Sequence, residues 1–496
     1  MTTTGTAKRV AIVGGGITGL SAAYSLLKRA RELEEPLKIT LIEASERLGG
    51  KICTERTQDF LIEGGPDAFL VQKPWAVRLC RELGLGDELV APRPGKTYVL
   101  VGGRLRRLPE GAMGLIPTRL GSFARSGLFT PWGKLRMGLD LLIPPKRDDR
   151  DESLAQFIAR RLGREALERL AEPLLAGVYA ADPRSLSLEA TFPMLRELER
   201  RHGSLIRGAL RMRRQGRKPD PQRADGKPPP VFLTLRDGLG ALVDALVSRL
   251  EPHATLLVGR RVVRLEPLPK GYRLTLDDRD RRHADAVVLT TPAYVTAELV
   301  EALSPEAAEL LEGIPYASTV GVTLAFRRQD VGHPLDGTGF VVPRSEGRKL
   351  TACTWSSSKW PGRAPEGFVL LRAFLGRFGG PDVLGLEDPD LVGLVLDELR
   401  DLLGLRGNPV LARVHRWPRA MPQYLVGHLE RLVRIEEALR GHPEIVLAGA
   451  AYRGIGLPDC IRQGEEASQA VLRRLFPETA SASAPGSASA AATRPA

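Results

Sequence analysis

Apolar runs broken by glycine define the start of the chain. Residues 10–13 are uniformly apolar, residues 14–16 are all glycine, and residues 17–23 continue in small and apolar side chains. A short apolar run bounded by a turn is typical of a strand buried in a parallel sheet, and the segment after the turn has helical spacing. Residues 38–42 predict a second strand, which ends at Glu43. The pattern therefore predicts an α/β fold whose parallel sheet contains these two strands.

The same periodicities predict the elements that follow. Helices are expected at residues 75–83, 153–162, 164–175, 240–250 and 391–402. Strands are expected at residues 231–235, 256–258, 262–265, 272–276 and 286–290, a second sheet at residues 319–326, 339–342, 349–355 and 368–375, and a glycine-turn hairpin at residues 97–101 and 104–108. Helical patterns dominate residues 109–213, and Gly177 is expected to interrupt them.

The first glycine turn has the spacing of a dinucleotide-binding site. Gly14, Gly16 and Gly19 occupy the positions of a G-x-G-x-x-G turn, which permits close backbone approach to a pyrophosphate at a helix N-terminus. Such a turn also occurs in strand-to-helix connections that bind nothing. Glu43 is the acid expected to bind a ribose hydroxyl, although its separation from Gly14 exceeds the usual ~20 residues because the helix and loop are long. The acid favours FAD or NAD over NADP.

Composition narrows the partners. The chain carries 72 basic and 59 acidic side chains, a net charge of +13. We attribute this excess first to compositional bias, then to an anionic lipid or an acidic substrate, and last to nucleic acid. Aromatic residues are only 5% of the chain and no nucleic-acid module is present, so no nucleic-acid partner is expected.

The cysteines and the apolar segments bear on location. Cys53, Cys80, Cys353 and Cys460 are scattered without a histidine cluster, so neither a disulfide framework nor a metal site is expected. No signal peptide and no run of ~18 apolar residues occur, so a cytoplasmic protein is expected. Residues 115–143 are rich in apolar side chains and cations. Such a segment forms either the core of a helical lobe or a membrane-surface contact, and we expect a core role for most of its apolar residues.

Several segments together resemble known proteins. Residues 43–51 contain an acid, Arg47 and the pair Gly49-Gly50, and so resemble the flavin amine oxidase superfamily. Residues 63–70 and 449–461 narrow the resemblance to the porphyrinogen oxidases of haem biosynthesis. Further matching segments are residues 173–183, 186–187, 417–418, 422–424 and 427–428. The resemblance extends from residue 8 to residue 476.

This resemblance implies a discontinuous, Rossmann-like FAD-binding domain with a second-sheet substrate-binding domain and a helical lobe. The implied FAD-binding segments are residues 1–85, 231–298 and 416–476. Residues 86–230 would form the hairpin and the helical lobe, residues 299–415 the substrate-binding sheet, and residues 477–496 a disordered tail. Related oxidases place a membrane-associated lobe in the helical interval, so a peripheral membrane contact is expected, and a homodimer is left open.

The resemblance also implies the site. The flavin accepts the hydride, so no catalytic side chain is expected. The turn at residues 455–457 would direct its amides to the pyrimidine end of the flavin, and Val262 would meet the adenine through its backbone. The implied cofactor contacts are Gly14, Gly15, Gly16, Ile17, Thr18, Gly19, Glu43, Ala44, Arg47, Lys51, Gly65, Pro66, Asp67, Ala68, Val262, Trp417, Gly449, Ile455, Gly456 and Leu457.

A tetrapyrrole substrate needs a broad apolar slot with cations at its rim. By resemblance, Gly177, Val341 and Phe374 form the slot walls, and Lys73 is the leading carboxylate partner. Arg104 and Arg377 are further candidates for that role. Oxygen is the expected electron acceptor.

Three alternatives bear on the activity. The Gly65-to-Leu70 segment, with aspartate at position 67 and Lys73 following, resembles the soluble enzymes that act on coproporphyrinogen III, whereas protoporphyrinogen enzymes often carry arginine at position 67. We therefore favour coproporphyrinogen III. An amine oxidase would use an aromatic cage and a lysine near the flavin, for which Tyr452 and Lys359 are candidates. A flavin-free escort protein has the same architecture, but the intact glycines and Glu43 oppose it.

Overall fold

The computed structural model describes residues 7–109, 112–113, 116–117, 126–215 and 230–477. A surface loop expected at residues 216–230 and the tail expected at residues 477–496 lie outside them, apart from Pro230 and Pro477. Within the described ranges, no helix is both long enough and apolar enough to cross a membrane.

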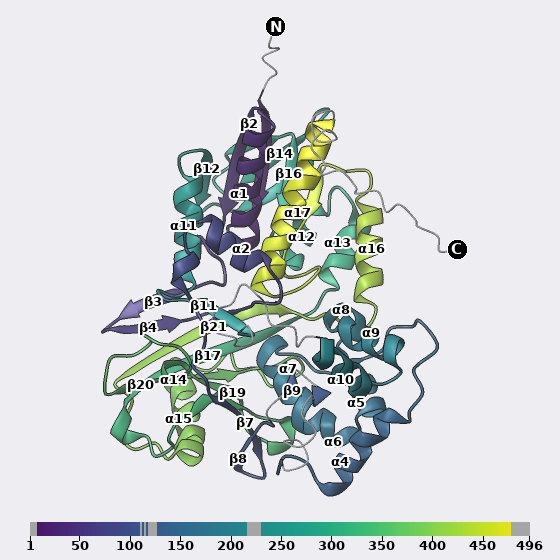
Figure 1. Cartoon of the computed structure of the whole chain (residues 1–496). Coiled ribbons are helices and arrows are strands. Elements are labelled where there is room, and N and C mark those ends of the chain that lie inside the picture. The colour runs from purple at the N-terminus through teal and green to yellow at the C-terminus, as the bar shows by residue number, and fades with distance from the viewer. Residues whose placement is uncertain (1–6, 110–111, 114–115, 118–125, 216–229, 478–496) are drawn as a thin grey trace.

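A parallel sheet forms the upper half of the molecule in Figure 1. Its strand order is β12 (Ala254–Val258), β2 (Leu37–Glu43), β1 (Lys8–Val13), β16 (Ala286–Leu289) and β22 (Ile445–Leu447). The four longer strands fall where the apolar runs predicted them, so the expected α/β fold is confirmed. The short strand β22 was not predicted, because its three residues are too few to show a period.

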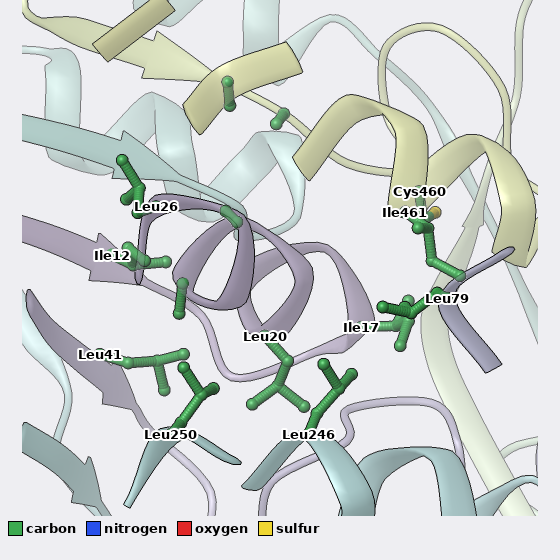
Figure 2. Packing of buried hydrophobic residues seen from close by; sticks show 14 of the residues in the cluster. Ile12, Ile17, Leu20, Leu26, Leu41, Leu79, Leu246, Leu250, Cys460 and Ile461 are labelled. Atoms are coloured by element: carbon green, nitrogen blue, oxygen red, sulfur yellow. The ribbon is translucent and has the colours of Figure 1, made fainter. Parts of the chain in front are cut away.

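Helices cover both faces of this sheet. On one face lie α1 (Ile17–Glu32), α2 (Trp75–Glu82), α11 (Gly240–Leu250) and α17 (Leu457–Leu475), and Figure 2 shows Leu246 and Leu250 of α11 beside Leu20 of α1. The other face packs against α12 (Ala293–Val300), α13 (Pro305–Glu312) and α16 (His428–Ala438). Burial of both faces explains why the central strand β16 and residues 10–13 of β1 are uniformly apolar.

Helix α17 is in close contact with helix α1. A Cβ atom at Gly464 would lie 2.5 Å from the Thr18 carbonyl oxygen, so only glycine fits at this crossing. One turn further along, the hydroxyls of Ser25 and Ser468 are 2.6 Å apart. The last helix of the fold is therefore held against the first by backbone proximity and a buried hydrogen bond.

An antiparallel meander extends from the parallel sheet. It consists of β13 (Val262–Pro267), β14 (Tyr272–Leu276) and β15 (Arg281–Ala284). The sequence pattern predicted the first two strands and missed β15. That strand is an edge strand whose first residues are exposed and charged, so it carries no apolar alternation.

The second sheet is mixed and has seven strands. Their order is β21 (Leu411–Pro422), β17 (Tyr316–Arg327), β20 (Phe368–Leu375), β19 (Leu350–Trp355), β18 (Gly337–Val341), β7 (Lys96–Val101) and β8 (Arg104–Arg107). The expected hairpin is therefore present as β7 and β8, and it extends this sheet. Helix α15 (Asp388–Leu403) covers one face through its leucines. Strand β21 continues through residues 415 and 416, where we placed a boundary.

A helical lobe lies beside the second sheet. Its helices are α4 (Pro131–Gly138), α5 (Leu154–Arg161), α6 (Arg164–Ala166), a π-helical turn (Leu167–Ala171), α7 (Glu172–Tyr179), α8 (Leu188–Thr191), α9 (Pro193–His202) and α10 (Leu205–Gln215). The expectation that Gly177 interrupts the helical pattern is wrong. Helix α7 passes through Gly177 and ends at Tyr179, before the positive-φ residue Ala180.

The apolar residues around α4 are distributed differently from expectation. Of those described, Leu128, Phe129 and Met137 are buried, whereas a larger group is exposed: Trp132, Leu135, Leu139, Leu141 and Leu142. The prediction that most of them form a core is therefore wrong for the described part of the segment. Arg136, one of the cations interleaved with these apolar residues, donates to the carbonyls of Ala159 and Arg160 and so caps helix α5.

A buried ion pair anchors the turn after α4. The Arg161 and Asp140 side chains are fully buried, and Arg161 Nε donates to Asp140 Oδ1 over 2.6 Å. Arg161 also donates to the Ile143 carbonyl, and Asp140 Oδ2 accepts from Ser204 Oγ over 2.6 Å. The exposed leucines of this turn are therefore carried by a rigid support.

Candidate cofactor and substrate site

The first glycine turn joins β1 to α1. Gly14 has φ +108°, and a Cβ atom at Gly19 would lie 2.0 Å from the Gly14 carbonyl oxygen, so both positions require glycine for the chain's own packing. Gly16 is different. Its φ is −72°, and the nearest heavy atom to a Cβ there is the Gly50 Cα, 4.0 Å away. The absence of a side chain at Gly16 therefore leaves open space beside the N-terminus of α1, where Ile17 and Thr18 begin the helix.

Glu43 lies at the end of β2, directly beside this turn. Its Oε2 accepts the Gly15 N–H over 2.6 Å, and its Oε1 accepts the N–H and the hydroxyl of Ser45 over 2.8 and 2.7 Å. These bonds fix the carboxylate and the adjoining Ala44 at the carboxyl end of the sheet. The Arg260 N–H donates to the Glu43 carbonyl over 2.9 Å, which brings the start of β13, at Val262, to the same place.

The second glycine pair closes against the first. The Gly49 N–H donates to the Gly15 carbonyl over 2.8 Å, and Gly49 forms a parallel bridge with Gly16. Arg47 donates to the carbonyls of Gly50 and Ile52 over 2.6 and 2.8 Å. Among the implied cofactor contacts, Arg47 is therefore engaged in supporting the loop that carries the second glycine pair.

Lys51 follows that loop. Its side chain is exposed, yet surrounding protein lowers its pKa through burial, and the Cys460 thiol opposes this shift. The Lys51 backbone also faces Gly65, since a Cβ at Gly65 would lie 1.7 Å from the Lys51 carbonyl oxygen.

Residues 64–66 pass between the two sheets and are held by their carbonyl groups. Arg372 of β20 donates to the Gly64 and Gly65 carbonyls, each over 2.6 Å, and Trp417 Nε1 donates to the Gly64 carbonyl over 2.9 Å. Arg372 is only 6% exposed, and burial lowers its pKa. Sequence reasoning missed Arg372, although a lone arginine within an apolar strand is a signal that could have identified it.

Asp67, the next residue, belongs to a partly buried ion pair. Its Oδ2 accepts Lys359 Nζ over 2.9 Å and Trp360 Nε1 over 3.0 Å. Burial raises the pKa of this carboxyl, but Lys359 and these hydrogen bonds outweigh the burial and bring the pKa to about 2. Lys359 is therefore engaged as the counter-ion of Asp67, and Ala68 follows toward β5 (Phe69–Leu70).

The last segment of the site is the loop between β22 and α17. Tyr424 Oη donates to the Ala450 carbonyl over 2.7 Å and accepts the Gly454 N–H over 2.9 Å. Gly449 approaches Thr18, since a Cβ at Gly449 would lie 3.9 Å from Thr18 Oγ1. Tyr424 therefore holds two points of this loop, a role that the sequence around Tyr424 does not indicate beyond the resemblance.

His428 completes the support of this loop. Its Nε2 is 2.9 Å from the Tyr452 carbonyl oxygen, so that nitrogen carries the proton, and its ring stacks on Tyr424 with 4.1 Å between ring centres. Burial lowers the pKa of His428 to about 4, so the ring is neutral near pH 7. Tyr452, which we considered for an aromatic cage, is buried and 6% exposed.

The N-terminus of α17 follows directly. Gly456 is the N-cap residue, so the amides of Leu457 and its neighbours lie at the positive end of the helix dipole. Asp459 does not cap the helix: no side-chain cap bond forms, and both of its carboxylate oxygens instead accept Lys73 Nζ, over 2.7 and 2.6 Å. Lys73, our leading partner for a substrate carboxylate, thus already has an acid beside it.

These segments fit a dinucleotide cofactor. The open space at Gly16 and the fixed carboxylate of Glu43 lie at the N-terminus of α1, the loop before α17 approaches Thr18 through Gly449, and Lys51 adds a cation after the second glycine pair. Donor N–H groups at helix N-termini bind phosphates, and an acid at the end of β2 suits a ribose. The individual cofactor contacts remain predictions.

The expected slot residues lie on one face of the second sheet. Val341 of β18 is opposite Ala352 of β19, which is opposite Phe374 of β20, so the three side chains point the same way. Helix α7, which contains Gly177, packs on β18 and β19, and both Val341 and Ile455 contact the core of the lobe. Arg104 is exposed on the edge strand β8.

Comparison with known proteins defines the class. Residues 17–472 match the family described as flavin containing amine oxidoreductase, so the chain belongs to that family. It is an oxidoreductase, and the expected cofactor, FAD, is supported by the flavin that defines the family.

Individual relatives narrow the class to porphyrinogen oxidases. The chain is 40% identical to coproporphyrinogen III oxidase of Bacillus subtilis over 470 residues, which is 95% of this chain and 99% of the relative. It is 33% identical to the chloroplastic protoporphyrinogen oxidase 1 of Arabidopsis thaliana, covering 92% and 86%. A crystal structure of a putative protoporphyrinogen oxidase from Exiguobacterium superposes with a TM-score of 0.83 at 36% identity, covering 94% and 99%.

Proposed function

We propose that this protein oxidises coproporphyrinogen III to coproporphyrin III with oxygen and releases hydrogen peroxide. The observation that carries the proposal is the match over nearly the whole length to the bacterial relatives of that name, 40% identical in Bacillus subtilis and 36% in Staphylococcus aureus. The plant relatives named protoporphyrinogen oxidase are 33% identical. Aspartate at position 67, fixed by Lys359, agrees with the same choice.

The reaction removes six electrons, so it uses three oxygen molecules and yields three of hydrogen peroxide. When bound, FAD supplies the two-electron acceptor for hydride. The chain's own residues position and surround it: Arg372 and Trp417 fix the carbonyls of Gly64 and Gly65, and the amides at the start of α17 stabilise negative charge. His428 is neutral and held by Tyr452, so it supports the loop rather than moving protons.

Turnover on two substrates tests the proposal. The purified protein is expected to show flavin absorbance and to oxidise coproporphyrinogen III faster than protoporphyrinogen IX under oxygen. Faster oxidation of protoporphyrinogen IX would reverse the choice of substrate. A protein without flavin absorbance and without either activity would instead favour the escort alternative.

We also propose that the turn around α4 contacts a membrane surface. Trp132, in the first turn of α4, is 79% exposed, and Leu142 is 77% exposed directly after the turn that the buried Arg161–Asp140 pair anchors. Rigid, exposed apolar side chains of this size are typical of a surface that inserts between lipid headgroups. A homodimer likewise stays a prediction.

Vesicle sedimentation tests the membrane contact. The holoenzyme is expected to sediment with vesicles that contain anionic lipid, and the double variant Trp132→Ser with Leu142→Ser is expected to remain in solution. Val433→Ser, which removes a half-exposed apolar side chain from α16, is the matched control and is expected to sediment normally. Equal sedimentation of the double variant and the wild type would refute the assignment.

A further inference from the structure

Two arginines lie just beyond the slot wall. Arg344 follows Val341 by three residues and Arg377 follows Phe374 by three residues. Strands β18 and β20 flank β19, and both run antiparallel to it, so their carboxyl ends lie at the same end of the sheet. The Phe378 N–H donates to the Ala180 carbonyl over 2.7 Å, which ties this edge to the segment after α7. Both arginines are thus placed where the sheet and the helical lobe meet.

Arg344 is neutralised by the lobe. Its Nε lies 3.2 Å from Glu172 Oε1, and its Nη2 donates to the Phe378 carbonyl over 3.0 Å. Asp182, the other acid nearby, is 3.8 Å from Arg344 and is bound more closely by Arg184, over 2.6 Å. Both acids at this junction therefore already have a cation as partner.

Arg377 has no such partner. Among the described residues, no carboxylate lies within ion-pair distance of its guanidinium, and its only hydrogen bond is a long one, 3.4 Å, from Nη2 to the Leu350 carbonyl. Its Nη1 is buried without a hydrogen-bond partner among the described groups. Burial lowers the pKa of Arg377, the neighbouring Arg344 lowers it further, and the more distant carboxylate of Glu172, which is paired with Arg344, only partly opposes this shift. A half-buried cation in this state is stabilised by an anionic ligand.

The comparison with Lys73 reverses the order in which the sequence ranked the cations. Lys73 already has both oxygens of Asp459 within hydrogen-bond distance, whereas no carboxylate among the described residues lies within ion-pair distance of Arg377. We propose that Arg377 binds a propionate of the tetrapyrrole at the junction of sheet and lobe, with Arg344 holding the Phe378 segment in place. The planar guanidinium with free N–H groups is suited to a carboxylate. This inference rests on the proposed function and names a substrate anchor within it.

The anchor explains a preference for the more acidic porphyrinogen. Coproporphyrinogen III carries a propionate on every pyrrole ring, whereas protoporphyrinogen IX has two fewer carboxylates. Arg377, a cation without an ion-pair partner among the described residues, adds a carboxylate-binding position at the end of β20 and so favours the substrate with more carboxylates. Arg377 is therefore a binding residue and takes no part in hydride transfer.

Kinetics of the holoenzyme test the anchor. Arg377→Gln is expected to raise the KM for coproporphyrinogen III about tenfold or more, the effect of losing a charge-assisted hydrogen bond, with kcat little changed. The KM for the tetramethyl ester of the same porphyrinogen is expected to stay unchanged, because the ester has no charge to bind. Arg400→Gln, an exposed arginine on α15 at the other face of the sheet, is the matched control.

The outcomes separate the anchor from the activity. If the wild type turns over coproporphyrinogen III and Arg377→Gln has an unchanged KM for it, the anchor is wrong and the proposed function stands. If the wild type oxidises neither porphyrinogen, both fall. FAD content and melting temperature show whether each variant folds. Arg377→Lys, which keeps the charge, is expected to show a smaller rise in KM than Arg377→Gln. If the two variants raise the KM equally, for the free porphyrinogen and for its tetramethyl ester alike, the anchor is also wrong.

Discussion

The open space beside Gly16 separates a cofactor role from a packing role. At Gly16 a methyl group meets no heavy atom closer than 4.0 Å, and the backbone, with φ −72° and ψ 178°, is one that alanine adopts freely. Gly16→Ala is therefore expected to change the free energy of unfolding of the apoprotein by less than about 1 kcal/mol, since the gain from a less flexible unfolded chain offsets the weaker N-cap.

FAD binding is expected to respond differently. The methyl group would occupy the space that a pyrophosphate needs to reach the amides of α1. Loss of one hydrogen bond to a charged group costs about 1.5–3 kcal/mol, which is about ten- to a hundredfold in Kd, and displacement of the diphosphate removes more than one. Gly16→Val, with a larger side chain, is expected to abolish FAD retention.

Flavin titration of the apoprotein, with its melting temperature, measures both effects. Gly393→Ala provides the control, because Gly393 also has open space around its Cβ position but lies in α15, away from the site. Gly19→Ala provides the contrast: its Cβ would lie 2.0 Å from the Gly14 carbonyl oxygen, so folding itself should fail. A Gly16→Val protein with normal flavin content would refute the assignment, and an unfolded Gly16→Ala protein would refute the packing argument.

Three further predictions concern the support of the site. Arg372→Gln is expected to lower the free energy of unfolding of the holoenzyme by about 2–4 kcal/mol, because two buried carbonyls lose their charged donor. Urea titration measures this change, and a loss below roughly 0.5 kcal/mol, the level of surface substitutions, would contradict the prediction. The buried, neutral His428 takes up a proton in the unfolded chain below pH ~6.5 but in the folded protein only below about 4. The free energy of unfolding should therefore fall by about 3 kcal/mol as the pH drops through that window. In His428→Asn the free energy of unfolding should depend less steeply on pH over the same range. Lys73→Gln should lower stability by less than about 1 kcal/mol, because its ion pair with Asp459 is partly exposed; a KM for coproporphyrinogen III raised as far as in Arg377→Gln would restore Lys73 as a principal anchor.

Local sequence patterns predicted the dinucleotide fold because the central strands β1 and β16 are buried along most of their length and carry clear apolar runs, whereas the short strand β22 shows no period. Strand β15 escaped prediction because it is a charged edge strand, and the continuity of α7 through Gly177 escaped because packing against the second sheet decides it. Patterns of apolar residues likewise could not tell Trp132, which is exposed, from Phe129, which is buried.

The residues of the candidate site likewise divide into those that a local sequence pattern predicts and those that it does not. Residues that bind through their backbone at a fixed spacing, such as Gly16, are legible in one sequence. Side chains that act across the fold are not, since Arg372 reaches Gly64 from more than three hundred residues away. Whether a cation already has an acidic partner is also not visible in the sequence. Lys73 and Arg377 are both isolated cations in the sequence, and the fold places Asp459 beside Lys73.

The contact between α1 and α17 bears on how the protein retains its cofactor. Helices α1 and α17 are separated by more than four hundred residues in sequence, yet the Gly464 backbone lies against Thr18. If the predicted flavin site is correct, it needs the N-termini of both helices, so a chain that has formed the glycine turn, the second sheet and the helical lobe without α17 lacks one of its walls. Retention of FAD is therefore expected to depend on this long-range contact, which is slow to form because it closes a long loop.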